Sequence, residues 1–526
     1  MRALGTALAA LVLATISSWA CSAGTPTGPV HTAQGDVTGV AAGTVESFKG
    51  IPYAAPPVGE LRWRPPAPGA KWTGVKAAEA FGPACMQPVR TGFGPAPATS
   101  EDCLTLNVWR PAQRPAGAKL PVMLWIHGGA FVSGSGGTPF YDGTHFAEHG
   151  VVIVTINYRL GRFGFFAHPA LDGGAGPVGN YGLMDQIAAL KWVQANIAAF
   201  GGDATNVTVF GESAGAISVN YLVASPAARG LFAKAIAESG FGRATPYQLK
   251  GARSAEQVGE FFATGVGIKG EDAAAAAALR ALTADQVNAP YGGLSDPNMP
   301  SPMVDGVIVK ETIARAFANG HQAHVPFMEG GNSYEASLFP QVGDNPDPVI
   351  ARAGDRAKVL ALYGNADPAK VARDLTTDSM ITEPTRYLAA EMDKAGVPSF
   401  VYHFSYVPAA QRATAFGAPH GGEISYVFDN LRDTAFSFGT RTFPAATADD
   451  HKISDAMIAY WVAFAKTGDP GSAGGVAWPR YTVKSDQLLE FGADGVEVRQ
   501  GFEKARLDFL EVKAEAPPVA AAGATQ

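Results

Sequence analysis

The sequence predicts an α/β fold in which helices flank a large, mostly parallel central sheet. Short, mostly apolar runs recur along the chain, at residues 122–126, 151–156, 207–210, 235–237, 325–328 and 400–404. Such runs are typical of parallel strands that helices cover on both faces. Residues 183–198 carry apolar side chains at helical spacing, so we expect one of the covering helices there.

Length and composition indicate a compact globular protein. The chain has 526 residues, of which 47% are hydrophobic and 17% charged, and its net charge is −7. A nucleic-acid-binding protein usually carries a basic patch, so this balance argues against that class. We expect one domain at residues 24–513 with an Ala-rich helical insertion at about 242–322. A tail rich in Ala, Pro and Gly at 514–526 is expected to be disordered.

Residues 1–23 have the pattern of a signal peptide. Arg2 precedes a short apolar run at residues 3–16, and small residues surround Ala20 and Ala23. The run is too short for a comfortable membrane-spanning helix, and no later segment is long and apolar enough. We therefore expect export to the periplasm or the medium without stable membrane insertion. A lipid anchor at Cys21 is the alternative, although the usual leucine is missing from the preceding residues.

The most informative motif is G-x-S-x-G at residues 211–215, which places Ser213 between two glycines, Gly211 and Gly215. An apolar strand-like run precedes the motif, and small residues suited to a helix start follow it. On a sharp strand-to-helix turn, the serine is strained and its hydroxyl is exposed at the carboxyl end of a sheet. The motif predicts that Ser213 is a nucleophile.

A serine nucleophile also needs donors for the oxyanion that forms during attack. Residues 127–131, His-Gly-Gly-Ala-Phe, follow the predicted strand at 122–126, and their small side chains let the backbone approach a substrate carbonyl. Two N–H groups from the stretch Gly128, Gly129 and Ala130, together with the N–H of Ala214, are the candidate donors.

The candidate base is His420. It lies in a loop rich in Gly and Pro, and it follows Ser213 in the chain. His403 falls within an apolar run and is interpreted as a structural histidine. His321 and His324 precede a predicted strand and are interpreted as loop residues.

The acid that orients the base is expected between Ser213 and His420, on a loop after a strand. Glu335 fits this position best, and Glu329 and Asp305 remain alternatives on position alone.

Beyond Cys21, only two cysteines are present, Cys85 and Cys103. In an exported protein they are expected to form a disulfide, with two buried free thiols as the alternative.

From about residue 45 to residue 481 the chain resembles the type-B carboxylesterases and cholinesterase-like hydrolases. The resemblance depends on ordered motifs, which include FKGIPYA at 48–54, EDCLTLNV at 101–108, NYRLG at 157–161, GNYGLMDQ at 179–186 and FGGD at 200–203. Near the end, Trp461, Gly468 and Pro470 match the family's C-terminal helix and turn. The resemblance implies an α/β-hydrolase fold with a helical insertion over an active-site gorge.

The resemblance also implies roles for individual residues. The triad would be Ser213, Glu335 and His420, although Ala336 stands where the family often has glycine after the acid. The implied oxyanion donors are Gly129, Ala130 and Ala214, and the implied supporting residues are Glu212 and Ser239. A Cys85–Cys103 disulfide and a structural Arg62–Glu101 salt bridge follow in the same way. A single disulfide is typical of bacterial members.

The expected activity is hydrolysis of a small-molecule carboxylic ester through an acyl-enzyme, without a metal or cofactor and by a monomer or dimer. An amide or thioester hydrolase with the same triad is one alternative. A non-catalytic binding protein is another, although such relatives typically lose a triad member. The sequence does not assign gorge-lining roles to Phe131, Tyr141, Tyr334 or Phe428.

Overall fold

The computed structural model describes residues 24–88, 98–172, 178–290, 293–294, 296–438 and 441–515. The expected signal peptide at residues 1–23, including Cys21, lies outside these residues. Of the tail expected from residue 514, residues 514 and 515 end helix α16 (Lys504–Glu515), and the rest lies outside the described residues. Within the described ranges, we find no helix with the length and apolar character needed to cross a membrane.

A twelve-stranded sheet runs through the molecule in the order β1-β4-β5-β9-β11-β10-β14-β15-β18-β19-β22-β23. From β11 to β22 all neighbours are parallel, and antiparallel strands extend the sheet on both sides. The mostly parallel sheet is therefore confirmed. The strands, in sheet order, are Thr25–Pro26, Val40–Ala42, Val45–Pro52, Thr105–Pro111, Val152–Ile156, Leu120–Ile126, Gly202–Glu212, Lys234–Glu238, Phe327–Asn332, Ser399–Phe404, Gln487–Gly492 and Gly495–Gln500.

The other regular elements connect or cover these strands. The short strands are β2 (Val30–His31), β3 (Asp36–Thr38), β6 (Val75–Ala77), β7 (Ala84–Cys85), β8 (Thr99–Ser100), β12 (Phe165–Phe166), β13 (Gly179–Asn180), β16 (Tyr247–Gln248), β17 (Met303–Val304), β20 (Phe436–Phe438) and β21 (Arg441–Phe443). The helices before α16 are α1 (Thr144–Glu148), α2 (Gly161–Gly164), α3 (Tyr181–Asn196), α4 (Ala214–Ala224), α5 (Ala255–Gly265), α6 (Ala273–Arg280), α7 (Ala284–Val287), α8 (Ile313–Ala318), α9 (Gln341–Asp344), α10 (Asp347–Ala353), α11 (Arg356–Leu362), α12 (Pro368–Thr377), α13 (Glu383–Lys394), α14 (Ile424–Val427) and α15 (Ala448–Thr467).

Each apolar run that predicts a strand lies in or overlaps a strand of the sheet. Residues 325–328 lie partly before their strand, because β18 starts at Phe327 and continues to Asn332. Pro326, which has no N–H to donate to a neighbouring strand, directly precedes this start. The helix expected at 183–198 is α3, which begins two residues earlier.

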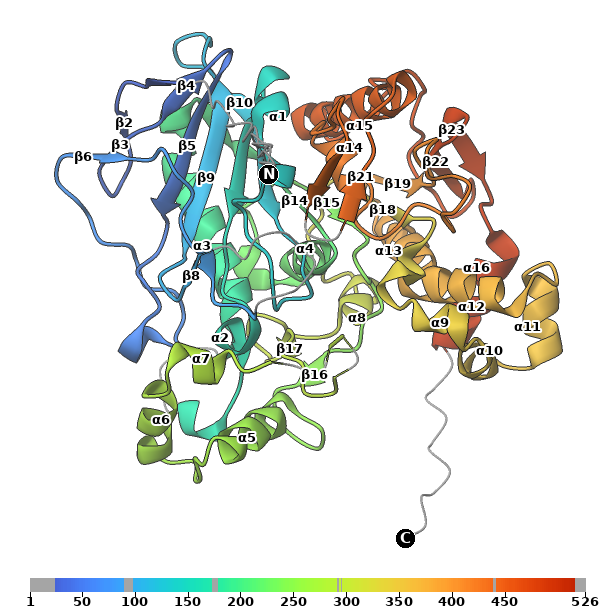
Figure 1. Ribbon diagram of the computed structural model, residues 1–526, viewed down its shortest axis with the longest axis horizontal. Coiled ribbons are helices and arrows are strands. Elements are labelled where there is room, and N and C mark those ends of the chain that lie inside the picture. The colour runs from blue at the N-terminus through green and yellow to red at the C-terminus, as the bar shows by residue number, and fades with distance from the viewer. Residues whose placement is uncertain are drawn as a thin grey trace, which may run out of the picture.

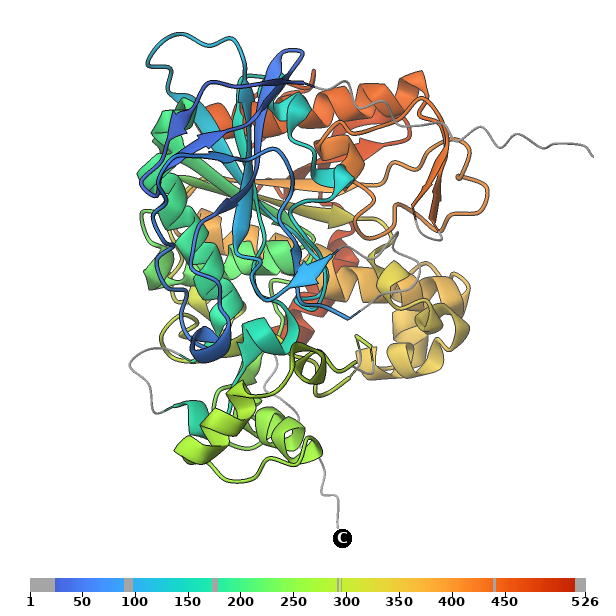
Figure 2. The same cartoon turned by 60° about the vertical axis from the view of Figure 1, so that its left-hand side comes forward.

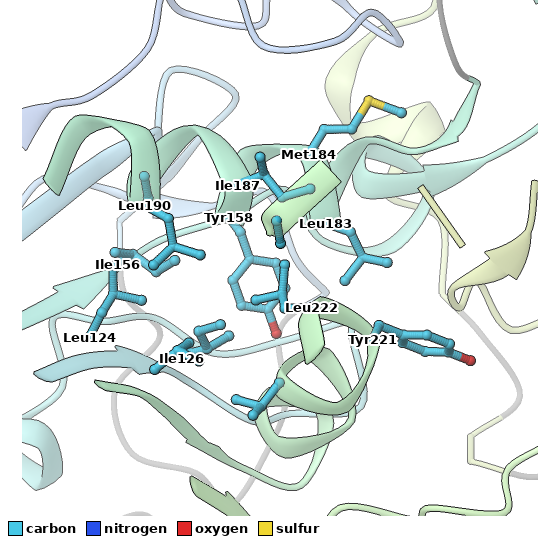
Figure 3. Packing of buried hydrophobic residues seen from close by; sticks show 14 of the residues in the cluster. Leu124, Ile126, Ile156, Tyr158, Leu183, Met184, Ile187, Leu190, Tyr221 and Leu222 are labelled. Atoms are coloured by element: carbon cyan, nitrogen blue, oxygen red, sulfur yellow. The ribbon is translucent and has the colours of Figure 1, made fainter. Parts of the chain in front are cut away.

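Alternating side chains of the central strands pack on opposite faces of the sheet. Leu124 and Ile126 of β10 belong to one apolar cluster, whereas Met123 and Trp125 belong to another. Figure 3 shows side chains of α3 and α4 packed against the first of these faces. Helices α1 and α15 contribute to the cluster on the other face. Both faces are therefore covered, as the fully apolar strands predict.

Two groups of helices extend from the sheet. The segment expected as a helical insertion, residues 242–322, contains β16, α5 to α7, β17 and α8. Figures 1 and 2 show α5 to α7 together at one end of the molecule. The second group, α9 to α12, follows β18, and α10 to α12 share a small apolar cluster with Leu510 of α16, which the sequence analysis did not anticipate.

Candidate active site

Ser213 occupies the sharp turn between β14 and α4. Its backbone angles, φ 57° and ψ −121°, are ones that L-residues rarely adopt. Two hydrogen bonds hold this conformation: Ser213 N donates to Glu238 O at 2.9 Å, and Ile217 N donates to Ser213 O at 2.8 Å. Ser213 is partly exposed, so its hydroxyl is not sealed inside the core.

The two glycines of the motif permit close packing of the turn against β10. A Cβ atom on Gly215 would lie 1.9 Å from Ile126 O, and one on Gly211 would lie 2.5 Å from the same oxygen. Any larger residue would push the turn away from the sheet. The G-x-S-x-G pattern therefore follows from packing as much as from chemistry.

The loop after β10 lies beside the nucleophile. A Cβ atom on Gly128 would be 3.1 Å from Ser213 Cβ and 2.6 Å from Glu212 Oε2. Gly129, Ala130 and Phe131 all have positive φ, with values of 109°, 57° and 62°. The loop is thus held in an uncommon conformation next to Ser213.

The base of this loop is anchored by stacked rings. His127 stacks on Tyr158 with 4.5 Å between the ring centroids, and Tyr158 Oη donates to His127 O at 2.9 Å. Burial lowers the pKa of His127 to about 4, so this ring is neutral and structural at ordinary pH. Ala214 begins α4, and the N–H groups of a first helical turn have no acceptor within the helix.

His420 and Glu335 are in direct contact. His420 Nδ1 lies 2.5 Å from Glu335 Oε2, and Glu335 is fully buried. The other carboxylate oxygen, Oε1, accepts hydrogen bonds from Ser239 Oγ at 2.5 Å and from Asn332 N at 2.7 Å. Glu335 is therefore fixed on one side by the ends of β15 and β18 and on the other side by the imidazole.

The loop that carries His420 lies along the segment that carries Glu335. Tyr334 forms a parallel bridge with Pro419, and Tyr334 N donates to Ala418 O at 2.9 Å. His420 N donates to Ser337 Oγ at 2.9 Å. These bonds set the distance between base and acid.

The other acid candidates lie elsewhere. Glu329 is buried within β18, where burial raises its pKa well above the usual range. Asp305 accepts hydrogen bonds from the backbone of its own turn and from Asn180. Of the three carboxylates that chain position left open, Glu335 is the one in contact with His420.

A second carboxylate lies at the opposite nitrogen of the base. Glu212, the residue before Ser213, has Oε1 3.1 Å from His420 Nε2. A Cβ atom on Gly421 would also lie 3.4 Å from Glu212 Oε1. The turn that carries Ser213 and the loop that carries His420 are therefore in contact.

These charges set the protonation of the base. Burial by itself would lower the pKa of His420, but the carboxylates of Glu212 and Glu335 outweigh burial and raise this pKa to about 9. The imidazolium form is thus strongly stabilised. That form is the one a base adopts after it has accepted a proton.

Two further buried glutamates, Glu423 and Glu238, lie near Glu212, and the sequence analysis missed both. Burial, followed by Glu212 and Glu335, raises the pKa of Glu423 to about 8, and Asn332 Nδ2 donates to its carboxylate. Burial and Glu423 raise the pKa of Glu238, which accepts from Trp461 Nε1 at 2.8 Å. Glu423 lies three residues after His420, and this proximity in the chain was the one feature of the sequence that could have indicated its place in the site.

The remaining sequence predictions concern structure. Cys85 and Cys103 form a disulfide with 5.0 Å between their Cα atoms. Arg62 holds Glu101 by two contacts, Nη2 to Oε1 at 2.5 Å and Nε to Oε2 at 2.7 Å. Both expectations are confirmed.

The other histidines named above do not join the site. His403 is buried in β19 against Phe502, and burial lowers its pKa to about 4. His321 is exposed and contacts Glu311, and His324 is exposed. Among the described residues, no three His, Cys, Asp or Glu side chains are grouped so that they could hold a metal ion.

The sequence did not assign gorge-lining roles to four aromatic residues, and the structure places three of them in apolar packing and one near the surface. Phe131 packs on Phe165, and Tyr141 and Phe428 pack around buried Trp125. Tyr334 contacts exposed Phe416 at the edge of the His420 loop.

Comparison with protein families gives a match over almost the whole described chain. The model described as "Carboxylesterase family" matches residues 26–360 and 362–510. A fumonisin B1 esterase of Sphingopyxis macrogoltabida is 40% identical over 484 residues, which cover 88% of this chain and 86% of that protein. A para-nitrobenzyl esterase of Bacillus subtilis (strain 168) is 36% identical over 481 residues, which cover 88% of this chain and 94% of that protein.

Solved structures agree with these matches. A PNB esterase superposes with a TM-score of 0.76 at 31% identity and covers 92% of this chain and 99% of its own. Carboxylesterase EST55 of Geobacillus stearothermophilus gives a TM-score of 0.77 at 34% identity, with 91% and 99% covered. The fold is therefore the α/β-hydrolase fold of these esterases.

Proposed function

We propose, because the chain belongs to the carboxylesterase family, that it hydrolyses esters through an acyl-enzyme on Ser213. The chain is a carboxylic ester hydrolase, and the assignment of roles to its residues is our proposal. The observation that supports these roles most directly is the placement of His420. It contacts Glu335 through Nδ1, and its Nε2 lies beside Glu212, the residue that precedes Ser213.

In the first half of the reaction, Ser213 Oγ attacks the ester carbonyl and His420 Nε2 takes the hydroxyl proton. Glu335 keeps the remaining proton on Nδ1 and stabilises the imidazolium. The N–H groups of Gly129, Ala130 and Ala214 stabilise the oxyanion of the tetrahedral intermediate. The intermediate collapses when His420 gives its proton to the leaving alcohol.

In the second half, His420 removes a proton from water, which attacks the acyl group on Ser213. The second tetrahedral intermediate uses the same oxyanion donors and releases the carboxylic acid as His420 returns the proton to Ser213. Each proton transfer, between Ser213, the leaving alcohol and water, passes through His420.

Replacement of the nucleophile tests this proposal. We expect Ser213→Ala to fold as the wild type does and to lose several orders of magnitude in kcat/KM for p-nitrophenyl butyrate. Residual hydrolysis would come from the oxyanion donors alone. Retention of activity within tenfold of the wild type would show that another residue is the nucleophile. Assay of the matched butyranilide separates an esterase from an amidase.

We further propose that the protein is exported with residues 1–23 removed. The Cys85–Cys103 disulfide supports an oxidising compartment. Amino-terminal sequencing of protein recovered from the periplasm and the medium tests this. Recovery only in the cytosol with an intact amino terminus would contradict the proposal. A diacylglyceryl group on Cys21 would show that the exported protein is anchored through this residue and is not released as a free form.

A further inference from the structure

Phe241 is an aromatic residue next to the base that the mechanism above does not use. Its ring meets the His420 ring edge to face, with 6.2 Å between centroids and 74° between planes. Phe241 is partly exposed, whereas Ser239 and Gly242 near it are buried. Phe241 therefore combines partial exposure with a direct ring contact to the imidazole.

The backbone around Phe241 is clamped in place. Ser239 and Phe241 both have positive φ, 59° and 46°, which is uncommon for residues with a side chain. Ser239 N donates to Gly330 O at 2.8 Å, and Ala244 N donates to Phe241 O at 2.9 Å. A conformation of this kind persists only where its surroundings enforce it.

Both flanking glycines are packed against helices. Asn220 of α4 donates to Gly240 O at 2.9 Å, and a Cβ atom on Gly240 would lie 2.7 Å from Asn220 Nδ2. A Cβ atom on Gly242 would lie 2.6 Å from Leu388 Cδ1 of α13. The two contacts fix the direction in which the Phe241 side chain leaves the backbone.

We propose that Phe241 is a specificity-determining residue whose ring forms a rigid wall of the ester-binding site beside His420. The inference rests on the proposed function, because it takes His420 as the base that acts on the ester bound to Ser213. A planar, apolar wall accepts slender or flat apolar substituents on this side of the ester. It excludes acyl groups that branch next to the carbonyl, because the clamped backbone prevents the ring from withdrawing.

The test compares Phe241→Ala with wild type on two p-nitrophenyl esters, the acetate and the branched 2,2-dimethylpropanoate. Removal of the ring opens space for the branched acyl group, and one extra methylene in a pocket changes selectivity by about 10–200-fold. We expect the branched-to-linear ratio of kcat/KM to rise at least about tenfold. Phe241→Leu, which retains part of the bulk, should give an intermediate ratio.

Phe261→Ala is the matched control, because Phe261 is 68% exposed on α5. We expect removal of its ring to leave the branched-to-linear ratio unchanged. A ratio unchanged in both Phe241 variants, or an equal loss on both esters, overturns the inference. Ser213→Ala, assayed beside them, distinguishes the two proposals. If it is inactive while the Phe241 ratios do not move, only the inference about Phe241 fails; if it stays active, the proposed function itself fails.

Discussion

His420 lies between two carboxylates that act on it in different ways. Glu335 is hydrogen-bonded to Nδ1 and is itself fixed by Ser239 and Asn332, so it orients the ring. Glu212 lies next to Nε2, the atom that must accept the serine proton. A negative charge at that point stabilises the imidazolium after proton transfer. It also keeps the resting ring protonated, and hence inactive as a base, until the pH approaches its pKa of about 9.

We therefore expect Glu212→Gln to shift the pH profile of kcat/KM to lower pH. The wild-type ascending limb should follow deprotonation of His420, whose pKa the charges of Glu212 and Glu335 together raise to about 9 against the effect of burial. Without that charge the limb should move down by about 1 pH unit or more, the usual effect of one nearby charge. The plateau rate should fall, because the imidazolium in the transition state is less stabilised.

Glu311→Gln is the control for this experiment, since Glu311 contacts His321 on the surface. Its profile should coincide with that of the wild type. An unshifted limb in Glu212→Gln, or a limb that moves to higher pH, would show that Glu212 does not set the protonation of the base.

The sequence predicted the residues that chemistry demands and missed those that only the fold brings together. Ser213 and His420 occur in motifs with few alternatives, and Glu335 was the preferred of three positions. Glu238 ends a strand that is apolar in most of its residues, and nothing in its neighbours marks it as part of a carboxylate cluster. Its place beside Glu423 depends on the order of strands in the sheet.

Among the elements, the junction of β14 and α4 determines where the nucleophile lies. Gly215, in the first turn of α4, allows that turn to approach Ile126 O so closely that a methyl group would stand 1.9 Å from it. Backbone atoms of β10 lie in the centre of a packed sheet, so displacing them costs free energy.

Gly215→Ala should consequently destabilise the protein by about 1–3 kcal/mol, as overpacking does. It should also reduce kcat, because α4 and Ser213 shift relative to the oxyanion loop. Urea unfolding followed by fluorescence measures the first effect and ester turnover the second.

Gly265→Ala provides the contrast for this substitution. A Cβ atom there would meet nothing within 4 Å, and the residue ends α5. We expect it to leave activity unchanged and to stabilise slightly, by about 0.4–1 kcal/mol. Equal effects of the two substitutions would contradict the packing account of Gly215.

Elements with uniform apolar runs could be predicted from the sequence, and elements with mixed patterns could not. The strands β22 and β23 at one end of the sheet mix polar and apolar residues, and in the edge strand β23 the exposed Glu497 and Arg499 alternate with the partly buried Val496 and Val498. Helices α9 to α11 have four to seven residues and are too short for a periodic apolar stripe, whereas in α12 the buried Val371, Ala372 and Leu375 do fall at helical spacing. The stability of this group comes from packing of its helices on one another and on Leu510 of α16, which local sequence does not reveal.

At the scale of the whole molecule, covalent and ionic links tie distant segments together. The Cys85–Cys103 disulfide closes a separation of 18 residues. Arg62, paired with Glu101, also donates to the carbonyl oxygens of Arg280 and Leu282. The amino-terminal part of the chain is thus attached to the helical insertion.

Removal of the disulfide tests how much this link stabilises the molecule. A Cys85→Ser and Cys103→Ser double variant should lose about 3 kcal/mol of unfolding free energy by the chain-entropy relation. Dithiothreitol should destabilise the wild type by a similar amount and leave the double variant unaffected. Equal urea midpoints for wild type and variant would show that the link contributes nothing.

The central claim, that folding makes Ser213 the reactive nucleophile, is tested most directly by covalent trapping. After treatment with diethyl p-nitrophenyl phosphate, mass spectrometry of the digested protein should find a single diethylphosphoryl group, on the peptide that contains Ser213. Ser213→Ala should remain unlabelled under the same conditions. A label on another residue, or equal labelling of the Ser213→Ala variant, would contradict the account.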